Sequence, residues 1–197
     1  TYGHDVAAYS ADGITWTQTT LPASINWTSV AYGNGKFVVV AENSNIAAYS
    51  TDGVTWAQTT LPIEGYWGFV VYGSGKFVAL SGSSEIYSTD GVTWAQTQIP
   101  EGGGAYVAYG NGVFVTVYDG GTGALYSKDG ITWKEGKKPD SSCNCIAYGN
   151  GEFVALADFT VFRSANGAKW KDTYSVKGIL KGDGKGNLLA AEAGVDY

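Results

Sequence analysis

The sequence predicts an all-β fold, and three observations support this prediction. Residues that favour strands and tight turns are abundant, with 14 Tyr, 7 Trp and 29 Gly in 197 residues, against only 4 Pro. Charged residues make up 15% of the chain, a composition that excludes disorder. Hydrophobic residues show no helical periodicity while short motifs recur along the chain, which excludes a solenoid of helices.

Two motifs alternate along the chain with a period of about 39 residues. The first is S-x-D-G-x-T-W, and its copies end at Trp16, Trp56, Trp94, Trp133 and, in the altered form SANGAKW, at Trp170. The second is a Y-G-N-G type of motif, found as AYGNGKF from Ala31, VYGSGKF from Val71, AYGNGVF from Ala108, AYGNGEF from Ala147 and, weakly, LKGDGKGN from Leu180.

Each period contains two hairpin signals. Asn34-Gly35 is the type of pair that occupies the positive-φ positions of a two-residue turn, and Asp52-Gly53 marks a second turn. The flanking segments WTSVAY, KFVVVAE, NIAAYS and VTWAQTT read as four short strands, A to D. Four short strands with two tight turns in one period are typical of a blade of a β-propeller.

The repeats predict a single five-bladed β-propeller with four antiparallel strands in each blade. Four blades are expected at about 26–62, 63–100, 101–139 and 140–175. The fifth is shared, because 176–197 supplies only an A and a B strand and 1–22 supplies only a C and a D strand. Such sharing closes the ring of blades and leaves no open sheet edge.

Charge excludes several classes of function. The net charge is −6 and Arg163 is the single arginine, so no basic face is available for nucleic acid. No run of about 18 apolar residues occurs, so we expect no membrane insertion. The first 20 residues show no signal peptide.

No metal site or cofactor is expected. Cys143 and Cys145 form a C-x-C, but two residues of one strand are too far apart for an unstrained disulfide. His4 is the only histidine, so a set of nitrogen and sulfur metal ligands cannot be assembled. We therefore interpret both cysteines as small apolar core residues.

The S-x-D-G-x-T-W string resembles the Asp-box of sialidase-type, or BNR-like, repeats, although that family has one more residue between the Asp and the Gly. With the Y-G-N-G motif, the chain also resembles propeller domains of phage tail fibres and bacterial surface proteins. The resemblance implies that Asp12, Asp52, Asp90 and Asp129 are structural. Catalytic sialidases need three arginines and six blades, so no sialidase activity is expected. We predict a non-enzymatic protein, with a glycoside hydrolase as the less favoured alternative because candidate loops carry acidic residues.

The two ends of the blades differ in sequence. Both repeated turns fall at one end, whereas the divergent B–C loops and D–A linkers fall at the other, and loops on a rigid scaffold usually carry binding residues. Aromatic, amide and carboxylate groups at the divergent end suit sugar rings. The candidate ligand-binding residues are Trp27, Glu42, Asn43, Asn45, Tyr66, Trp67, Tyr106, Asp119, Asp158 and Phe159. Alternatively, Trp27 and Trp67 pack between blades and the acidic residues are merely solvated.

The sequence therefore predicts a binding propeller that recognises a cell-surface carbohydrate or protein receptor, as at a phage fibre tip or in an adhesin. The expected location is extracellular or on the virion surface, with homo-oligomers formed through a larger fibre. The alternative is a structural module that docks protein partners. The residues do not identify the ligand.

Overall fold

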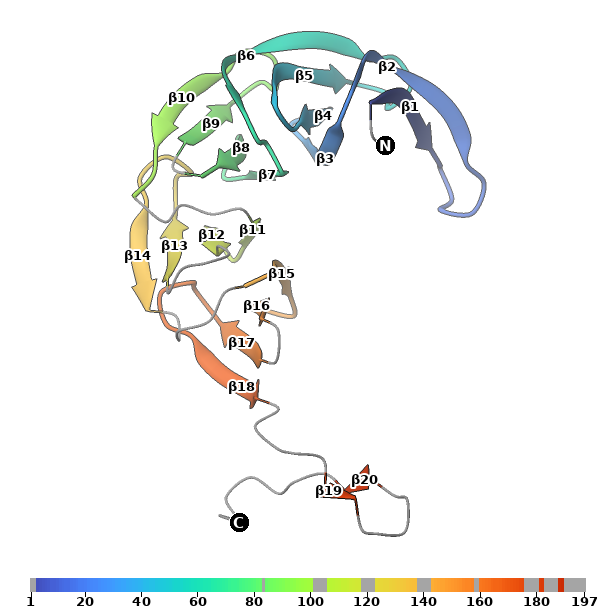
Figure 1. The fold of residues 1–197 in the computed structure, drawn as a ribbon. Helices are drawn as coiled ribbons and strands as arrows, with labels where there is room; N and C mark the ends of the chain where they lie inside the picture. Colours follow the sequence, from blue (N-terminus) through green and yellow to red (C-terminus); the bar gives the residue numbers. More distant parts are fainter. Residues whose placement is uncertain are drawn as a thin grey trace.

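The computed structural model describes residues 3–82, 84–100, 106–117, 123–137, 143–157, 160–175, 181–182 and 188–189. Every regular element among these residues is a β-strand, which confirms the all-β prediction. Sixteen strands form four antiparallel sheets of four strands, here termed blades 1 to 4. The strands follow chain order across each blade, and the blades stand side by side in an arc with their first strands innermost (Figure 1).

Blade 1 consists of β3 (Trp27–Gly33), β4 (Lys36–Ala41), β5 (Ser44–Ser50) and β6 (Ala57–Gly65). Blade 2 consists of β7 (Phe69–Gly73), β8 (Lys76–Ser81), β9 (Ser84–Ser88) and β10 (Ala95–Gln98). Blade 3 consists of β11 (Tyr106–Gly110), β12 (Val113–Val117), β13 (Gly123–Ser127) and β14 (Lys134–Lys137). Blade 4 consists of β15 (Cys145–Gly149), β16 (Glu152–Ala157), β17 (Thr160–Ser164) and β18 (Lys171–Ser175).

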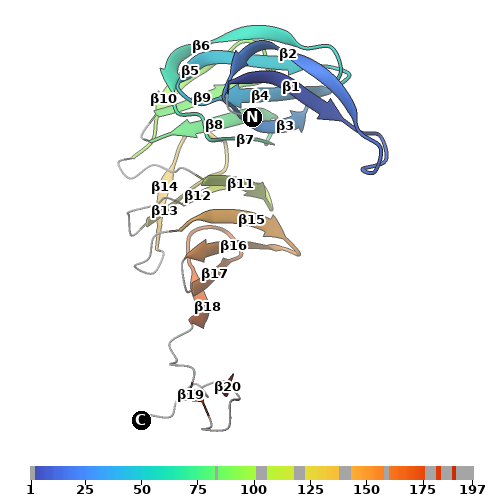
Figure 2. The same cartoon turned by 45° about the vertical axis from the view of Figure 1, so that its right-hand side comes forward.

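Two further sheets have two strands each. β1 (His4–Tyr9) pairs with β2 (Thr17–Ile25) and forms the half-blade, which lies beside blade 1 (Figure 2). β19 (Lys181–Gly182) pairs with β20 (Leu188–Leu189). Among the described residues no strand pairing joins these two sheets, so the shared fifth blade and the count of five blades stay predictions.

The A–B turns have the predicted backbone. Asn34 and Gly35 both have positive φ, at 48° and 72°, and the equivalent pairs of blades 2 to 4 behave in the same way. Two positive-φ residues match the right-handed twist of the flanking strands in a two-residue hairpin. This confirms the Asn-Gly turns as the source of the β3–β4 register, in which Gly33 pairs with Lys36.

The Asp of each S-x-D-G-x-T-W string holds the turn that follows its C strand. In blade 1, Oδ1 of Asp52 accepts hydrogen bonds from the backbone N–H groups of Val54 and Thr55, both at 2.8 Å. The Ser50 hydroxyl donates to the same carboxylate at 2.8 Å and accepts from Gly53 N–H. These bonds lower the pKa of Asp52 to about 2, with the Thr55 amide contributing most. The predicted structural role of this Asp is confirmed.

This turn also shifts the start of the D strand. The segment from Val54 to Trp56 was predicted to be strand, but it completes the turn and β6 begins at Ala57. At its other end β6 continues beyond the predicted linker at Pro62 to Gly65. A register irregularity between Ser44 and Ile46 of β5 allows this extension.

The hydrophobic core lies between blades. One cluster joins Val38 and Val40 of blade 1 to Phe77 and Trp94 of blade 2, and two similar clusters lie between blades 2 and 3 and between blades 3 and 4. The motif Trp of blades 2, 3 and 4 therefore packs against the preceding blade, as expected from the sequence. Cys143 belongs to the cluster between blades 3 and 4, as predicted for a small apolar residue.

A tyrosine of each following blade fills the space above a motif glycine. A Cβ at Gly33 would overlap the ring of Tyr72, one at Gly73 would overlap Tyr109, and one at Gly110 would overlap Tyr148. The innermost strands can therefore approach one another closely only with glycine at this position.

The part of the chain that the structure describes contains no helix with the length and apolar character needed to span a membrane.

Candidate functional site

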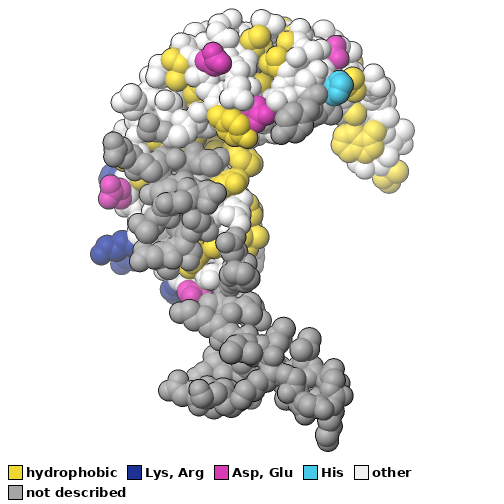
Figure 3. Space-filling view, viewed as in Figure 1, with side chains coloured by type: hydrophobic (Ala, Val, Ile, Leu, Met, Phe, Trp, Pro, Cys, Tyr) yellow, Lys and Arg dark blue, Asp and Glu magenta, His cyan; other side chains and the backbone are white. Residues whose placement is uncertain are grey.

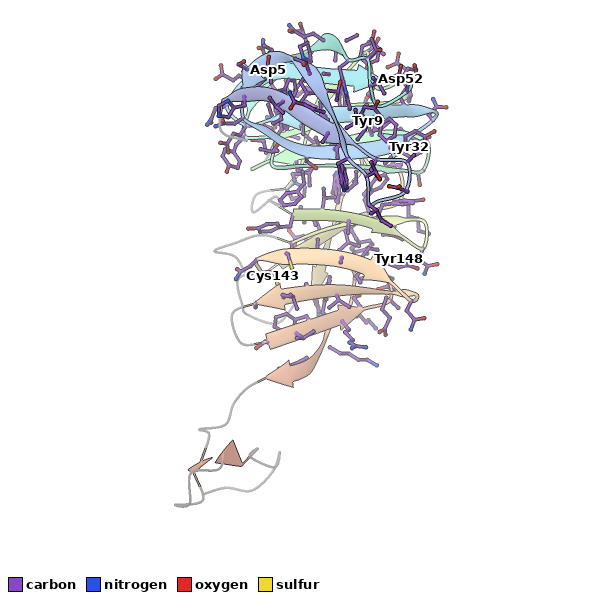
Figure 4. All side chains as sticks on the ribbon, turned by 90° about the vertical axis from the view of Figure 1, so that its right-hand side faces the viewer. Asp5, Tyr9, Tyr32, Asp52, Cys143 and Tyr148 are labelled. Carbon is purple, nitrogen blue, oxygen red and sulfur yellow. The ribbon has the colours of Figure 1, made fainter. Side chains whose placement is uncertain are left out.

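The two ends of the blades are distinct in the structure. Figure 4 shows Tyr32, Asp52 and Tyr148 at the end that carries the repeated turns, and Asp5 and Cys143 at the opposite, divergent end. The meander thus sorts the turns as predicted, because alternate connections of an antiparallel sheet lie at opposite ends.

A pocket of about 400 Å³ opens at the divergent end, where the inner parts of blades 1, 2 and 3 meet. Its volume lies in the range of small-molecule sites. Hydrophobic side chains are exposed along the inner side of the arc (Figure 3). The pocket is lined by Thr28, Tyr66, Gly68, Phe69, Leu80, Ser81, Gly82 and Tyr106.

Three aromatic rings form the apolar walls of this pocket. Phe69 starts β7 and Tyr106 starts β11, so equivalent positions of neighbouring blades bring their rings to 5.2 Å with a 56° tilt. Tyr66 lies in the connection before β7 and exposes 59% of its surface. Exposed rings of this kind offer flat apolar faces beside polar edges.

Polar groups of the pocket come from short side chains and backbone. The Thr28 hydroxyl bonds the carbonyls of Trp67 at 2.6 Å and Val40 at 3.1 Å, which fixes the position of its oxygen. The Ser81 hydroxyl accepts the Tyr66 N–H at 2.9 Å and retains its own hydrogen for donation. None of the lining residues that the structure describes carries a carboxylate, imidazole, guanidinium or ammonium group. The pocket is therefore suited to a neutral ligand.

Among the predicted site residues that the structure describes, two line this pocket, Tyr66 and Tyr106. Glu42 and Asn43 lie in the loop between β4 and β5, and Asn45 lies at the start of β5. The Glu42 carboxylate accepts a 2.8 Å bond from the Asn26 amide, whereas Asn43 and Asn45 are exposed. This loop is a separate polar patch that does not line the pocket.

The two tryptophans pack between blades, as the alternative interpretation expected. Trp67 is fully buried and its indole N–H donates to the Ser44 carbonyl at 3.1 Å, so its ring is covered and cannot stack on a ligand. Trp27 is half-buried against the half-blade, and its N–H donates to the Ala23 carbonyl at 2.9 Å. The predicted residues Asp119, Asp158 and Phe159 lie outside the described residues.

Phe69 is a pocket residue that the sequence analysis missed. It occupies the position of its A strand that Tyr106 occupies in blade 3, three residues before the motif tyrosine. Aligning the repeats would have identified it, because Ser29 and Cys145 hold this position in blades 1 and 4. Thr28, Leu80, Ser81 and Gly82 carry no comparable signal in the sequence.

Behind the pocket lies a buried carboxyl group. Glu85 is fully buried, pairs in register with the pocket residue Leu80, and accepts a 2.8 Å bond from the indole N–H of Trp133. Burial raises the pKa of Glu85 to about 8, against the effect of the Trp133 bond and with a further contribution from Asp129. Its Oε1 and the Thr116 hydroxyl are buried without a hydrogen-bond partner.

No group of three or more metal-ligating side chains occurs within the part of the chain that the structure describes. The only described ion pair joins Arg163 to Glu152 at 3.4 Å across the exposed surface of blade 4. Arg163 and Glu152 do not line the pocket.

No protein-family model matches the chain, and no curated protein sequence matches it. Solved structures match by fold. The streptogramin B lyase structure has a TM-score of 0.76 at 17% identity, over 90% of this chain and 64% of that chain. The structure of YCF48 bound to a D1 peptide has a TM-score of 0.65 at 17% identity, over 96% of this chain and 62% of that chain. The Pan2 WD40 domain of Neurospora crassa has a TM-score of 0.63 at 8% identity, over 84% of this chain and 58% of that chain.

This chain thus spans less than two thirds of the length of each of these structures. The matched proteins are β-propellers, and they include a lyase, a protein bound to a peptide and a WD40 domain. At these identities the likeness concerns the fold alone. Together with the four-stranded sheets, it establishes that the chain has a β-propeller fold.

Proposed function

We propose that this chain is a non-enzymatic binding propeller whose pocket takes a neutral sugar ring. The observation that carries the proposal is the pocket itself, in which Tyr66, Phe69 and Tyr106 line a space whose described lining residues carry no charge. A sugar ring has an apolar face that packs on aromatic rings and a polar rim that bonds groups such as the Thr28 and Ser81 hydroxyls.

The proposed partner is a glycan of a cell surface or a glycosylated receptor, as for a phage fibre tip or a bacterial adhesin. The protein then works outside the cell or on the virion surface, where a larger fibre can present several copies and increase avidity.

The described lining of the pocket favours binding over hydrolysis. Glycoside hydrolysis needs two carboxylates beside the scissile bond, and none is found among the lining residues that the structure describes. One of the similar lyase structures is a catalytically inactive His-to-Ala variant. In this chain the only histidine, His4, is exposed on the half-blade and does not line the pocket.

The test begins with a glycan array and continues with titration of the best-bound soluble oligosaccharide. Tyr66→Ala should weaken binding by about 1–3 kcal/mol, roughly 5- to 150-fold, which is the range for a lost aromatic anchor. Its melting temperature should stay close to that of the parent, because Tyr66 is 59% exposed.

A matched control lies in the neighbouring loop. The double variant Asn43→Gly/Asn45→Ala removes two exposed polar side chains at the same end of the blades without touching the pocket, and glycine suits the positive φ of 52° at position 43. We expect it to bind like the parent. If it loses binding while Tyr66→Ala retains it, the loop of blade 1 is the site and the pocket is not.

A docking module for protein partners is the second candidate. A pocket walled by aromatic rings also accommodates an apolar peptide side chain, and YCF48, a similar propeller, has been solved with a bound peptide. Absence of binding across the array, together with saturable binding of a peptide that Tyr66→Ala abolishes, would favour this candidate over the glycan.

A further inference from the structure

The hydroxyl groups of Thr28 and Ser81 have different hydrogen-bonding roles in the pocket. The Thr28 hydroxyl gives its hydrogen to the carbonyls of Trp67 at 2.6 Å and Val40 at 3.1 Å, so toward a ligand its oxygen can only accept. The Ser81 oxygen accepts the Tyr66 N–H at 2.9 Å, which leaves its own hydrogen for donation. These two side chains therefore offer a ligand one acceptor and one donor.

The acceptor and the donor lie beside the same short piece of backbone. Thr28 bonds the carbonyl of Trp67, and Ser81 bonds the N–H of Tyr66, the residue directly before it. The two hydroxyls come from different blades, because Thr28 belongs to β3 and Ser81 ends β8. A small group that enters the pocket can therefore turn one polar edge toward each blade.

The apolar part of the pocket is a corner between two rings. The ring centroids of Phe69 and Tyr106 are 5.2 Å apart with a tilt of 56°, and Leu80 adds to the apolar lining. Two tilted rings suit a compact apolar group such as a methyl, whereas a larger flat group needs one accessible face. Tyr66, with 59% of its surface exposed, offers such a face.

This set of groups matches an acetamido group better than the rim of a plain hexose. A hexose carries hydroxyl groups around its ring, and amide and carboxylate side chains satisfy such a rim because each makes several hydrogen bonds. None of the lining residues that the structure describes is an Asn, Gln, Asp or Glu. An acetamido group has one N–H, one carbonyl and one methyl, and its planar trans amide directs the N–H and the carbonyl to opposite sides.

We propose that the pocket selects an N-acetylhexosamine over the corresponding hexose, an inference that rests on the neutral-sugar binding proposed above. The acetamido N–H donates to the Thr28 oxygen, the carbonyl accepts from the Ser81 hydroxyl, and the methyl packs in the corner between Phe69 and Tyr106. The sugar ring lies on the exposed ring of Tyr66. Thr28 and Ser81 are thereby the residues that determine specificity.

Matched pairs of methyl glycosides test the selection on the parent protein. N-acetylglucosamine is compared with glucose, and N-acetylgalactosamine with galactose, by NMR titration. One buried methyl and two added hydrogen bonds should lower the Kd of the acetylated member at least about 10-fold in the better-bound pair. Equal Kd values within both pairs would overturn the selection and leave neutral-sugar binding intact. If none of the four binds, the selection is wrong, and the glycan array decides separately whether the pocket binds another sugar.

The position of the acetyl group gives a readout that does not depend on affinity. In saturation-transfer NMR the acetyl methyl should receive the strongest transfer from the protein, because it contacts two aromatic rings. Its proton signal should also shift upfield in the ring currents. Strongest transfer to the sugar ring protons, with the methyl signal unshifted, would place the methyl in solvent and contradict the proposal.

A variant at Thr28 tests the assigned acceptor. Thr28→Val removes the hydroxyl at similar shape and should reduce the preference for the acetylated sugar about 2- to 10-fold, whereas Thr28→Ser retains a hydroxyl and should keep the preference. Each preference is a ratio of two Kd values for one protein, so a loss of active protein does not affect it. A Thr28→Val protein with the full preference of the parent would refute the role of Thr28. If that variant does not fold, Ser81→Ala applies the same criterion to the donor.

Discussion

Replacing Glu85 with Ala should change stability in opposite directions at low and high pH. The carboxyl group is fully buried between blades 2 and 3 and contacts the Trp133 indole N–H at 2.8 Å. The positions equivalent to Glu85 in blades 1 and 3 are Ala47 and Ala124, both buried, so the small side chain fits this site of the repeat. Glu85→Ala therefore restores the residue that the neighbouring blades already have.

The magnitude follows from the pKa of Glu85, which burial raises from an ordinary 4.5 to about 8. Below pH 4.5 the group is neutral in both the folded and the unfolded protein, and its contribution to stability is fully present. As the pH rises from 4.5 to about 8, the unfolded protein has released the proton that the folded protein still holds, so stability falls across this range. A shift of this size corresponds to at most about 5 kcal/mol. Water entering the interface would reduce that figure.

The variant lacks this pH dependence but leaves the Trp133 N–H unpaired, at a cost of about 1–3 kcal/mol. The unpaired state is tolerated elsewhere in the fold, because the buried N–H groups of Trp56 and Trp94 have no hydrogen-bond partner. Glu85→Ala should thus be less stable than the parent at pH 5 and more stable at pH 9.

The assay is thermal unfolding of both proteins at several values between pH 5 and pH 9. For a domain of this size each kcal/mol shifts the melting temperature by roughly 2–4 °C, so the difference between the curves is measurable. Glu85→Gln retains an acceptor for Trp133 and cannot ionise, and Glu135→Ala removes an exposed carboxylate of β14 as a control. A parent–variant difference that is constant across this range would refute the buried, protonated Glu85.

Three further predictions concern the repeated turns and glycines. Asp90→Ala should cost about 1–3 kcal/mol in chemical denaturation, because the backbone N–H groups of Val92 and Thr93 lose the acceptor that they bond at 2.8 and 2.7 Å. The pKa of Asp90 is lowered to about 2 by hydrogen bonds, of which the bond from the Thr93 amide has the largest effect. The melting temperature of the parent should therefore fall as the pH drops from about 4 toward 2. Asp90→Asn should make that decline smaller. Gly73→Ala should prevent close packing of blades 2 and 3, since its Cβ would overlap the Tyr109 ring, and circular dichroism melting would detect the loss of cooperativity.

Sequence reasoning succeeded where a structure depends on neighbouring residues. The Asn34-Gly35 turn requires two positive φ angles, and the Asp52 turn requires a carboxylate two and three residues before the two amides that it bonds. Both follow from the local sequence. The start of β6 was predicted three residues early, because Val54 is hydrophobic like a strand residue but its N–H is already bonded by Asp52.

The candidate site could be predicted only in part, because its residues meet through the packing of separate blades. Tyr66 was identified from its place in a divergent linker. Trp67, the next residue, looked equivalent but is buried in the hydrophobic cluster between blades 1 and 2, where its indole N–H bonds the Ser44 carbonyl. Glu85 gave no signal at all, since its partner Trp133 lies 48 residues away in the sequence.

Four departures from the repeat lie at the pocket or behind it. Phe69 and Tyr106 replace the Ser29 of blade 1, Glu85 replaces alanine, and Thr116 stands where blades 1, 2 and 4 have Val39, Ala79 and Ala155. All four departing residues lie in or beside the contact of blades 2 and 3. We propose that these four residues adapt this interface to the binding role proposed above.

A last variant replaces two aromatic residues of the pocket by the residue that blade 1 has at the same position. Phe69→Ser/Tyr106→Ser gives both positions the residue that blade 1 carries, and the A strands tolerate it there, where the Ser29 hydroxyl accepts the Val70 N–H at 3.1 Å. The variant should fold with an intact cooperative transition, because Phe69 is 39% exposed and Tyr106 is only half-buried. It should also lose array binding, since two of the three aromatic walls are gone. Retained binding by the folded variant would show that the aromatic pocket is not where the ligand sits.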